Sequence, residues 1–167
     1  MKKLILSFAT ALAASAVFAQ SNTLSISQSG DGNAAPVTQR GSGNSLTVSQ
    51  IGNSNGDPYN PIVQEGTGQT GSITTQGNDN WQYFSQTGTS NNGTILTTGN
   101  GNGVYLTFGN TVANEVAVTQ VGNQNSSFNL LDYGASNNQV AVSQTGTGNI
   151  ASTWVRFATN SQVTLSQ

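Results

Sequence analysis

Side-chain amides are the chemical groups that recur at fixed spacing in this sequence. Asn22 is followed at two-residue intervals by Leu24, Ile26, Gln28 and Gly30. The same order of Asn, two apolar residues, Gln and Gly returns after 11 residues and recurs to the end of the sequence. A side-chain amide donates and accepts hydrogen bonds but carries no titratable proton. The chemistry that this spacing allows is therefore hydrogen bonding between repeated units.

Groups that support catalysis or metal binding are scarce. The sequence has no His and no Cys, which excludes imidazole and thiolate metal sites, Ser-His and Cys-His pairs, and disulfides. Gly66, Gly68 and Gly71 have dinucleotide-binding spacing, but no helix pattern follows them. We expect no enzyme activity, metal or cofactor. Six carboxylates are scattered over predicted turns and outward positions, except Asp132 at an expected inward Gln position: Asp31, Asp57, Glu65, Asp79, Glu115 and Asp132.

The composition is amide-rich and almost neutral. Gly, Asn, Gln, Ser and Thr supply 97 of the 167 residues, charged residues make up 6%, and the formal net charge is −2. Four basic residues give no surface for a nucleic-acid backbone, and no apolar run is long enough to insert in a membrane. Such a composition is typical of a prion-like disordered segment or of stacked β structure.

The first 19 residues have the pattern of a secretory signal peptide. Lys2 and Lys3 form a basic start, an apolar stretch follows, and Val17 and Ala19 stand at the −3 and −1 positions of a cleavage site. We therefore predict a signal peptide over residues 1–19, export from a bacterium, and a repeat domain over residues 20–167.

The repeat indicates one continuous solenoid. Its spacings are 11 or 12 residues, except for one of 14 at Gly56-Asp57-Pro58, and repetition on this scale is typical of stacked units. The thirteen repeat units, called arms below, are predicted to begin at Asn22, Asn33, Asn44, Pro58, Gln69, Asn80, Asn91, Asn102, Asn114, Ser126, Asn138, Asn149 and Ser161.

Each arm alternates with period two and ends in Gly, which predicts a strand of about six residues followed by a tight turn. Two arms would form one strand-turn-strand rung, and rungs would stack about 4.8 Å apart. The predicted fold is all-β: a β-solenoid of about six and a half rungs, with odd and even arms forming two facing parallel sheets in a cross-β-like arrangement.

Inward amides make physical sense only in such a stack, because a buried amide without partners is costly and identical amides in register satisfy one another. The open strand edges of the two end rungs predict self-association. The predicted self-assembly ladder consists of Asn22, Gln28, Asn33, Gln39, Asn44, Gln50, Asn114, Gln120, Asn138, Gln144 and Gln167. The predicted apolar core consists of Leu24, Ile26, Val37, Leu46, Val48, Val116, Val118, Val140, Val142, Val163 and Leu165.

The two outer faces differ in chemistry. Tyr83 and Tyr105 hold the same position in successive even arms and should stack. Hydroxyl columns on the odd arms leave open an ice- or carbohydrate-binding solenoid, and a polysaccharide-acting enzyme is a third alternative. The outward aromatics are Tyr59, Trp81, Tyr83, Tyr105, Tyr133 and Trp154. The hydroxyl columns are Ser25, Thr47, Ser72 and Thr94, and Ser27, Ser49 and Thr74.

The repeated Asn-x-φ-x-φ-x-Gln-x-Gly-x-x-Asn unit, in which φ is apolar, resembles the curlin repeat of bacterial curli fibre subunits. The resemblance spans residues 20–167 and implies an extracellular functional amyloid, secreted unfolded and polymerised at the cell surface for adhesion and biofilm matrix. It also implies copies of the chain, a second curlin-type subunit and outer-membrane secretion machinery as partners. A major subunit and a nucleator-type minor subunit both remain open.

Several arms depart from the repeat. Gly71 and Gly93 replace the first apolar residue of their arms, and Thr75 and Thr97 replace the Gln. Two other arms carry Phe108 and Val155 at the Gln position. We therefore expect the best-matched arms, over residues 22–50 and 114–144, to template assembly more strongly than the middle.

Overall fold

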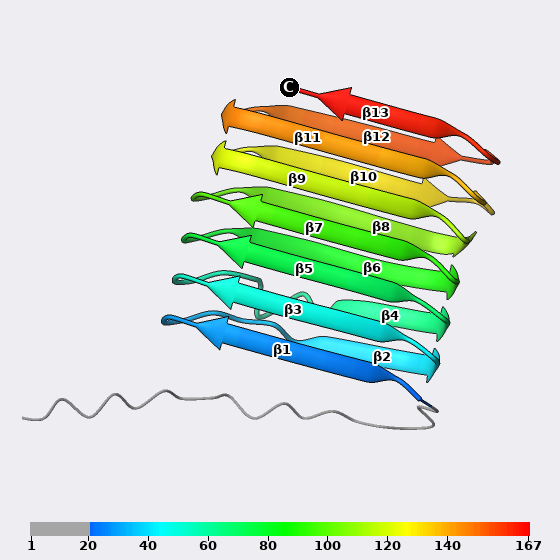
Figure 1. Cartoon of the computed structure of the whole chain (residues 1–167), viewed down its shortest axis with the longest axis horizontal. Coiled ribbons are helices and arrows are strands. Elements are labelled where there is room, and N and C mark those ends of the chain that lie inside the picture. The colour runs from blue at the N-terminus through cyan, green and yellow to red at the C-terminus, as the bar shows by residue number, and fades with distance from the viewer. Residues whose placement is uncertain (1–20) are drawn as a thin grey trace, which may run out of the picture.

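The computed structural model describes residues 21–167, which form thirteen β-strands (Figure 1). These strands are β1 (Thr23–Ser29), β2 (Val37–Ser42), β3 (Ser45–Ile51), β4 (Ile62–Thr67), β5 (Thr70–Gln76), β6 (Trp81–Thr89), β7 (Asn92–Thr98), β8 (Gly103–Val112), β9 (Glu115–Asn123), β10 (Ser126–Asp132), β11 (Gln139–Thr147), β12 (Ile150–Arg156) and β13 (Gln162–Ser166).

The strands form two parallel sheets that face each other. The odd-numbered strands β1 to β13 form a seven-stranded sheet, and the even-numbered strands β2 to β12 form a six-stranded sheet, each in sequence order. In Figure 1 the odd strands run in one direction and the even strands run in the opposite direction. The all-β two-sheet solenoid predicted from the repeat is confirmed.

The register aligns equivalent positions of neighbouring rungs. Leu24 pairs with Leu46 and Gln28 pairs with Gln50 between β1 and β3, and Val116 pairs with Val140 between β9 and β11. Each apolar, amide and glycine position of the repeat therefore becomes a column that runs along the solenoid axis.

The core lies between the two sheets. Each middle strand has a neighbouring strand on both sides, which cover its inward side chains. Each end strand has a neighbour on one side only within the described residues. Of the predicted core residues, the buried ones are Leu46, Val48, Val116, Val118, Val140 and Val142. Those that are partly buried and pack against this core are Leu24, Ile26, Val37, Val163 and Leu165.

Glycine at the turns keeps successive rungs close. Gly99 has a φ of +118°, and a Cβ atom added to it would lie 1.8 Å from the carbonyl oxygen of Gly122 in the next rung. A side chain at this position would push the rungs apart, because no Cβ atom tolerates so short a contact.

Two predicted arm starts are wrong. The fourth arm begins at Asn55 rather than Pro58, because Asn55 occupies the buried amide column and the extra residues form a loop before β4. Tyr59 is 90% exposed in this loop and does not lie on an even strand. The tenth arm begins at Asn125 rather than Ser126, because Asn125 donates to Asn102 in the ladder.

The one-residue shift in the tenth arm moves every side chain of β10 to the opposite face. Asp132 was expected to point inward, but it is only partly buried, and Leu131 fills the inward position instead. A carboxylate oxygen of Asp132 accepts a hydrogen bond from the Tyr133 N–H at 2.7 Å. The same shift brings Phe128 to the outer face.

The predicted signal peptide over residues 1–19 lies outside the described residues. Among the described residues, no helix is long and apolar enough to cross a membrane. The division of the chain into residues 1–19 and 20–167 stays a prediction.

Candidate functional site

The Gln residues of the odd sheet form an interrupted hydrogen-bonded ladder. Gln28 Nε2 donates to Gln50 Oε1 at 2.7 Å. Gln120 Nε2 donates to Gln144 Oε1 at 2.8 Å, and Gln144 Nε2 donates to Gln167 Oε1 at 3.1 Å. The five predicted Gln residues of this sheet therefore form two hydrogen-bonded groups.

The break between these groups falls at the two Thr positions. Thr75 follows Gln50 and Thr97 precedes Gln120 in register. The hydroxyl oxygens of both Thr residues and Oε1 of Gln120 are buried and have no hydrogen-bond partner in the described part of the chain. A Thr side chain is too short to reach the amide of the next rung, so the odd ladder is discontinuous in the middle of the solenoid.

A second Gln ladder runs along the first half of the even sheet. Gln39 Nε2 donates to Gln64 Oε1 at 2.7 Å, and Gln64 Nε2 donates to Gln86 Oε1 at 2.8 Å. This ladder ends where Phe108 pairs with Gln86. Gln64 Nε2 also reaches the backbone oxygen of Ser45 at 3.1 Å in the opposite sheet. The Gln amides therefore link neighbouring rungs and also the two sheets.

The Asn residues at the arm starts form two further ladders, one for each sheet. Asn102 is fully buried, and both its N–H and its Nδ2 donate to Asn80 Oδ1 at 3.0 Å. Asn102 Nδ2 also donates to the carbonyl of Gly122, and Oδ1 of Asn102 accepts from Asn125. Asn102 thus makes side-chain hydrogen bonds to the rungs on both sides of it.

The predicted Asn residues lie in these two columns. The column at the starts of the odd arms contains Asn22, Asn44, Gln69, Asn91, Asn114 and Asn138. The column at the starts of the even arms contains Asn33, Asn55, Asn80, Asn102, Asn125 and Asn149.

The two kinds of ladder have opposite hydrogen-bond directions. Between Gln side chains the donor is in the rung nearer the N-terminal end, whereas between Asn side chains of the arm starts the donor is in the rung nearer the C-terminal end. At the N-terminal end, Nδ2 of Asn22 is buried and has no hydrogen-bond partner among residues 21–167. At the C-terminal end, Oδ1 of Asn149 accepts no hydrogen bond within the described residues, although its N–H and Nδ2 both donate to Asn125. Each end therefore presents unused amide groups.

A third Asn ladder was missed in the sequence. Asn53, Asn78 and Asn100 lie on the exposed turns after odd strands, and Asn123 is the last residue of β9. The Nδ2 group of each of the first three donates to the Oδ1 of the next at 3.2–3.3 Å. The signal was the Gly-Asn pair that recurs at residues 52–53, 77–78, 99–100 and 122–123.

Aromatic side chains stack along the outer face of the even sheet. The ring centroids of Tyr83 and Tyr105 are 4.5 Å apart with nearly parallel planes, as expected, and Phe128 continues the stack at 4.7 Å. Trp154 follows at 5.9 Å with a tilted ring, and the guanidinium of Arg156 lies 4.6 Å from the Trp154 ring centroid. On the odd sheet, the hydroxyl column starting at Ser25 is in register but reaches an Ala in β9.

Charged groups do not gather into a reactive site. Arg40 and Glu65 form an exposed ion pair at 3.0 Å between neighbouring even strands. The described residues contain no group of three or more His, Cys, Asp or Glu side chains that could hold a metal ion. Their chemistry is therefore dominated by amide hydrogen bonds.

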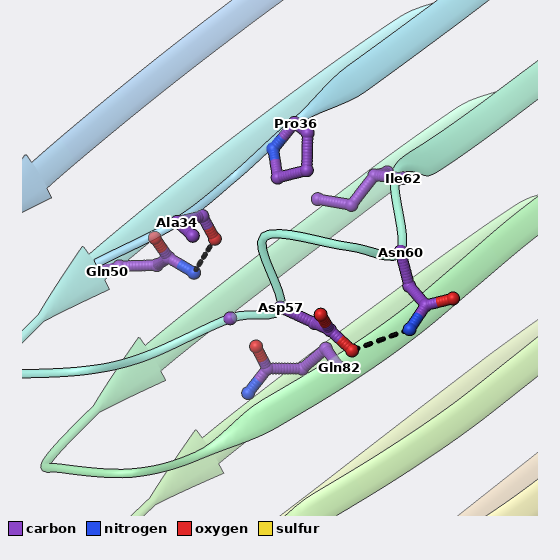
Figure 2. Close-up of a pocket in the computed structure, with 8 residues that line it drawn as sticks. Ala34, Pro36, Gln50, Asp57, Asn60, Ile62 and Gln82 are labelled. Carbon is purple, nitrogen blue, oxygen red and sulfur yellow. Dashed lines mark hydrogen bonds between the residues drawn. The ribbon is translucent and has the colours of Figure 1, made fainter. Parts of the chain in front are cut away.

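A small cavity beside the loop before β4 is lined by the amides of Gln50 and Gln82 (Figure 2). Gln82 is 3% exposed, and neither of its amide atoms has a hydrogen-bond partner among the residues that the structure describes. Asp57 accepts hydrogen bonds from the Asn60 side chain at 2.6 Å and from the Tyr59 N–H, which lower the pKa of Asp57. The cavity has room for about one water molecule, so it is too small for a substrate.

Residues 19–52 match the family profile of the curlin associated repeat. They include β1, β2 and β3, whose register continues through the later strands. No curated protein and no solved structure matches the chain. The profile match shows a curlin associated repeat in residues 19–52, and the same register continues from β3 through the later strands.

Proposed function

We propose that this chain is the structural subunit of an extracellular amyloid fibre that grows by end-to-end stacking of solenoids. The curlin repeat supports a fibre subunit of the curli type in general. Stacking would extend both sheets, so the fibre would be a continuous cross-β structure along the solenoid axis.

The open strand edges carry this proposal. Strands β1 and β2 at one end, and β12 and β13 at the other, are the outermost strands of their sheets. An exposed edge presents unpaired backbone N–H and C=O groups, which template pairing with another chain. The unused amides at both ends add side-chain hydrogen bonds to this pairing.

The fibre would serve cell adhesion and biofilm matrix, and the subunit would leave the cell unfolded through outer-membrane secretion machinery. We favour a major-type subunit over a nucleator, because Gln ladders reach both ends and charge is low. A nucleator would instead act at substoichiometric amounts on a second curlin-type subunit. The role is structural, with no catalytic step.

Purified residues 20–167 test this proposal directly. We expect thioflavin-positive fibres with a 4.7–4.8 Å meridional reflection, a lag phase, and removal of the lag by preformed seeds. Concentration-independent folding into a monomer that never elongates would contradict it. Thermal hysteresis without fibres would point to the ice-binding alternative, because the hydroxyl columns would then be the active surface.

A further inference from the structure

The two ends of the solenoid have different shapes. The described residues form thirteen strands, seven in the odd sheet and six in the even sheet. At the N-terminal end both sheets begin together, with β1 and β2. At the C-terminal end β13 extends the odd sheet, whereas no strand of residues 21–167 occupies the place above β12 in the even sheet (Figure 1). The C-terminal end is therefore a step one strand high.

A second copy in the same orientation does not fit this step. If β1 of the incoming copy paired with β13, its β2 would stand two strand positions above β12. One strand place in the even sheet would stay empty. The edges of β12 and of the incoming β2 would then remain unpaired inside the fibre, which is costly for buried backbone groups.

A copy rotated by a half-turn about the solenoid axis fits the step. The rotation exchanges the positions of the two sheets and reverses the strand directions, which are opposite in the odd and even sheets (Figure 1). The incoming β1 then runs parallel to β12 and fills the empty place, and the incoming β2 pairs with β13. Each of the four edge strands at this junction then pairs with a strand of the other copy.

The side chains of the rotated junction are complementary. Placed in the repeat register, Asn22 of the incoming copy lies on Asn149. The unpartnered Nδ2 of Asn22 would donate to Oδ1 of Asn149, as Asn149 itself donates to Asn125. Gln39 of the incoming copy lies on Gln167, whose Oε1 already accepts from Gln144 and whose Nε2 remains to donate. One Asn column and one Gln column thus continue across the junction in their own directions, whereas Gln28 lies on Val155 and Asn33 lies on Ser161.

We propose that successive copies of residues 20–167 in a fibre are related by a half-turn about the fibre axis and a rise of about 31 Å, which is six and a half rungs. This inference rests on the proposed stacking function. The Tyr83–Tyr105–Phe128 face would then alternate with the hydroxyl face of the odd sheet along each side of the fibre. Neither side would carry an unbroken aromatic stripe.

Cysteine pairs distinguish the two junctions, because the chain has no Cys of its own. Ser25 of an incoming copy lies beside Ser152 in the rotated junction and beside Thr164 in the unrotated one. All three side chains are exposed. Neighbouring strands about 4.8 Å apart allow a disulfide. We expect oxidised fibres of Ser25→Cys/Ser152→Cys to give a ladder of covalent oligomers, and Ser25→Cys/Thr164→Cys to give none.

Two controls keep the outcome interpretable. Ser25→Cys/Thr47→Cys places both thiols in one chain on paired residues, so it should form an intrachain disulfide and shows that oxidation works. Fibres that crosslink only through Thr164, or through neither pair while this control succeeds, would overturn the half-turn and leave the proposed fibre intact. Failure of the unaltered chain to polymerise would instead overturn the proposed function.

Unaltered fibres give a second measurement that needs no substitution. The half-turn predicts an axial repeat of about 62 Å in electron cryomicroscopy, because two chains complete the repeat. Stacking in one orientation needs seven rungs per chain and predicts about 34 Å. A repeat of about 34 Å would overturn the inference even if the cysteine variants failed to assemble.

Discussion

At the scale of single residues, buried and exposed Asn ladders offer a matched comparison. Asn102 is fully buried and bonds to three neighbouring residues, whereas Asn100 bonds within the exposed turn ladder. We expect Asn102→Ala to destabilise the fold by about 2–4 kcal/mol, because buried partners lose their hydrogen bonds. Asn100→Ala should cost about 0.5 kcal/mol or less. Guanidinium unfolding followed by circular dichroism measures both, and equal midpoints would contradict the comparison.

The inward Gln ladder should set the register of assembly. Gln50→Leu/Gln144→Leu keeps side-chain volume but leaves Gln28 Nε2 and Gln120 Nε2 without their amide acceptors. We expect a long lag and poor seeding by the unaltered chain, because apolar columns tolerate slippage more readily than matched amides. Ser49→Ala/Ser143→Ala, one residue away on the outer face, should assemble like the unaltered chain. Equal lag times for the two variants would show that the ladder does not control register.

At the scale of strands, cross-sheet packing explains the two inward glycines. A Cβ atom at Gly93 would lie 2.6 Å from the Phe84 ring, and one at Gly71 would lie 3.1 Å from it. Gly93→Ala should therefore destabilise the fold by about 1–3 kcal/mol through overpacking, although Ala suits a strand better than Gly. Adding Phe84→Leu should recover part of this loss. The thermal midpoints of the single and double variants measure it, and additive losses would contradict the packing account.

The strength of single rungs as templates stays a prediction at this scale. Peptide 22–39 contains two ladder Gln residues, whereas peptide 69–84 contains Gly71 and the unpartnered Thr75. We expect the first peptide to form fibres faster, because its ladder positions are filled and because Gly weakens a strand outside its tertiary context. Thioflavin kinetics at equal concentration measure the difference. Faster growth of peptide 69–84 would reverse the ranking.

At the scale of the whole molecule, the open C-terminal edge can be blocked without breaking the fold. Thr164 is outward on the edge strand β13, so its N–H faces the open side of the sheet. Thr164→Pro removes this donor, and we expect folded chains that elongate at least tenfold more slowly. Ala117→Pro, at the equivalent position of the interior strand β9, should lose β structure instead. Normal elongation of Thr164→Pro fibres would show that this edge takes no part in growth.

Much of the architecture follows from the sequence because the repeat is nearly periodic. Alternating polarity fixes strands, Gly fixes turns, and the 11-residue spacing brings equivalent positions into columns. Two arm starts were misplaced because both lie next to irregular spacings, where sequence alone does not reveal which Asn enters the buried column. Asn55 and Asn125 are identified only by their hydrogen bonds to Asn33 and Asn102.

The sequence by itself determined the strand-turn repeat, the two-sheet solenoid and the amide columns, because these depend on short-range periodicity. Only the tertiary structure decided what faces what across the core. It placed Phe84 against two glycines and moved Asp132 outward. These features depend on contacts between residues that are distant in the chain, and no local pattern of residues encodes such contacts.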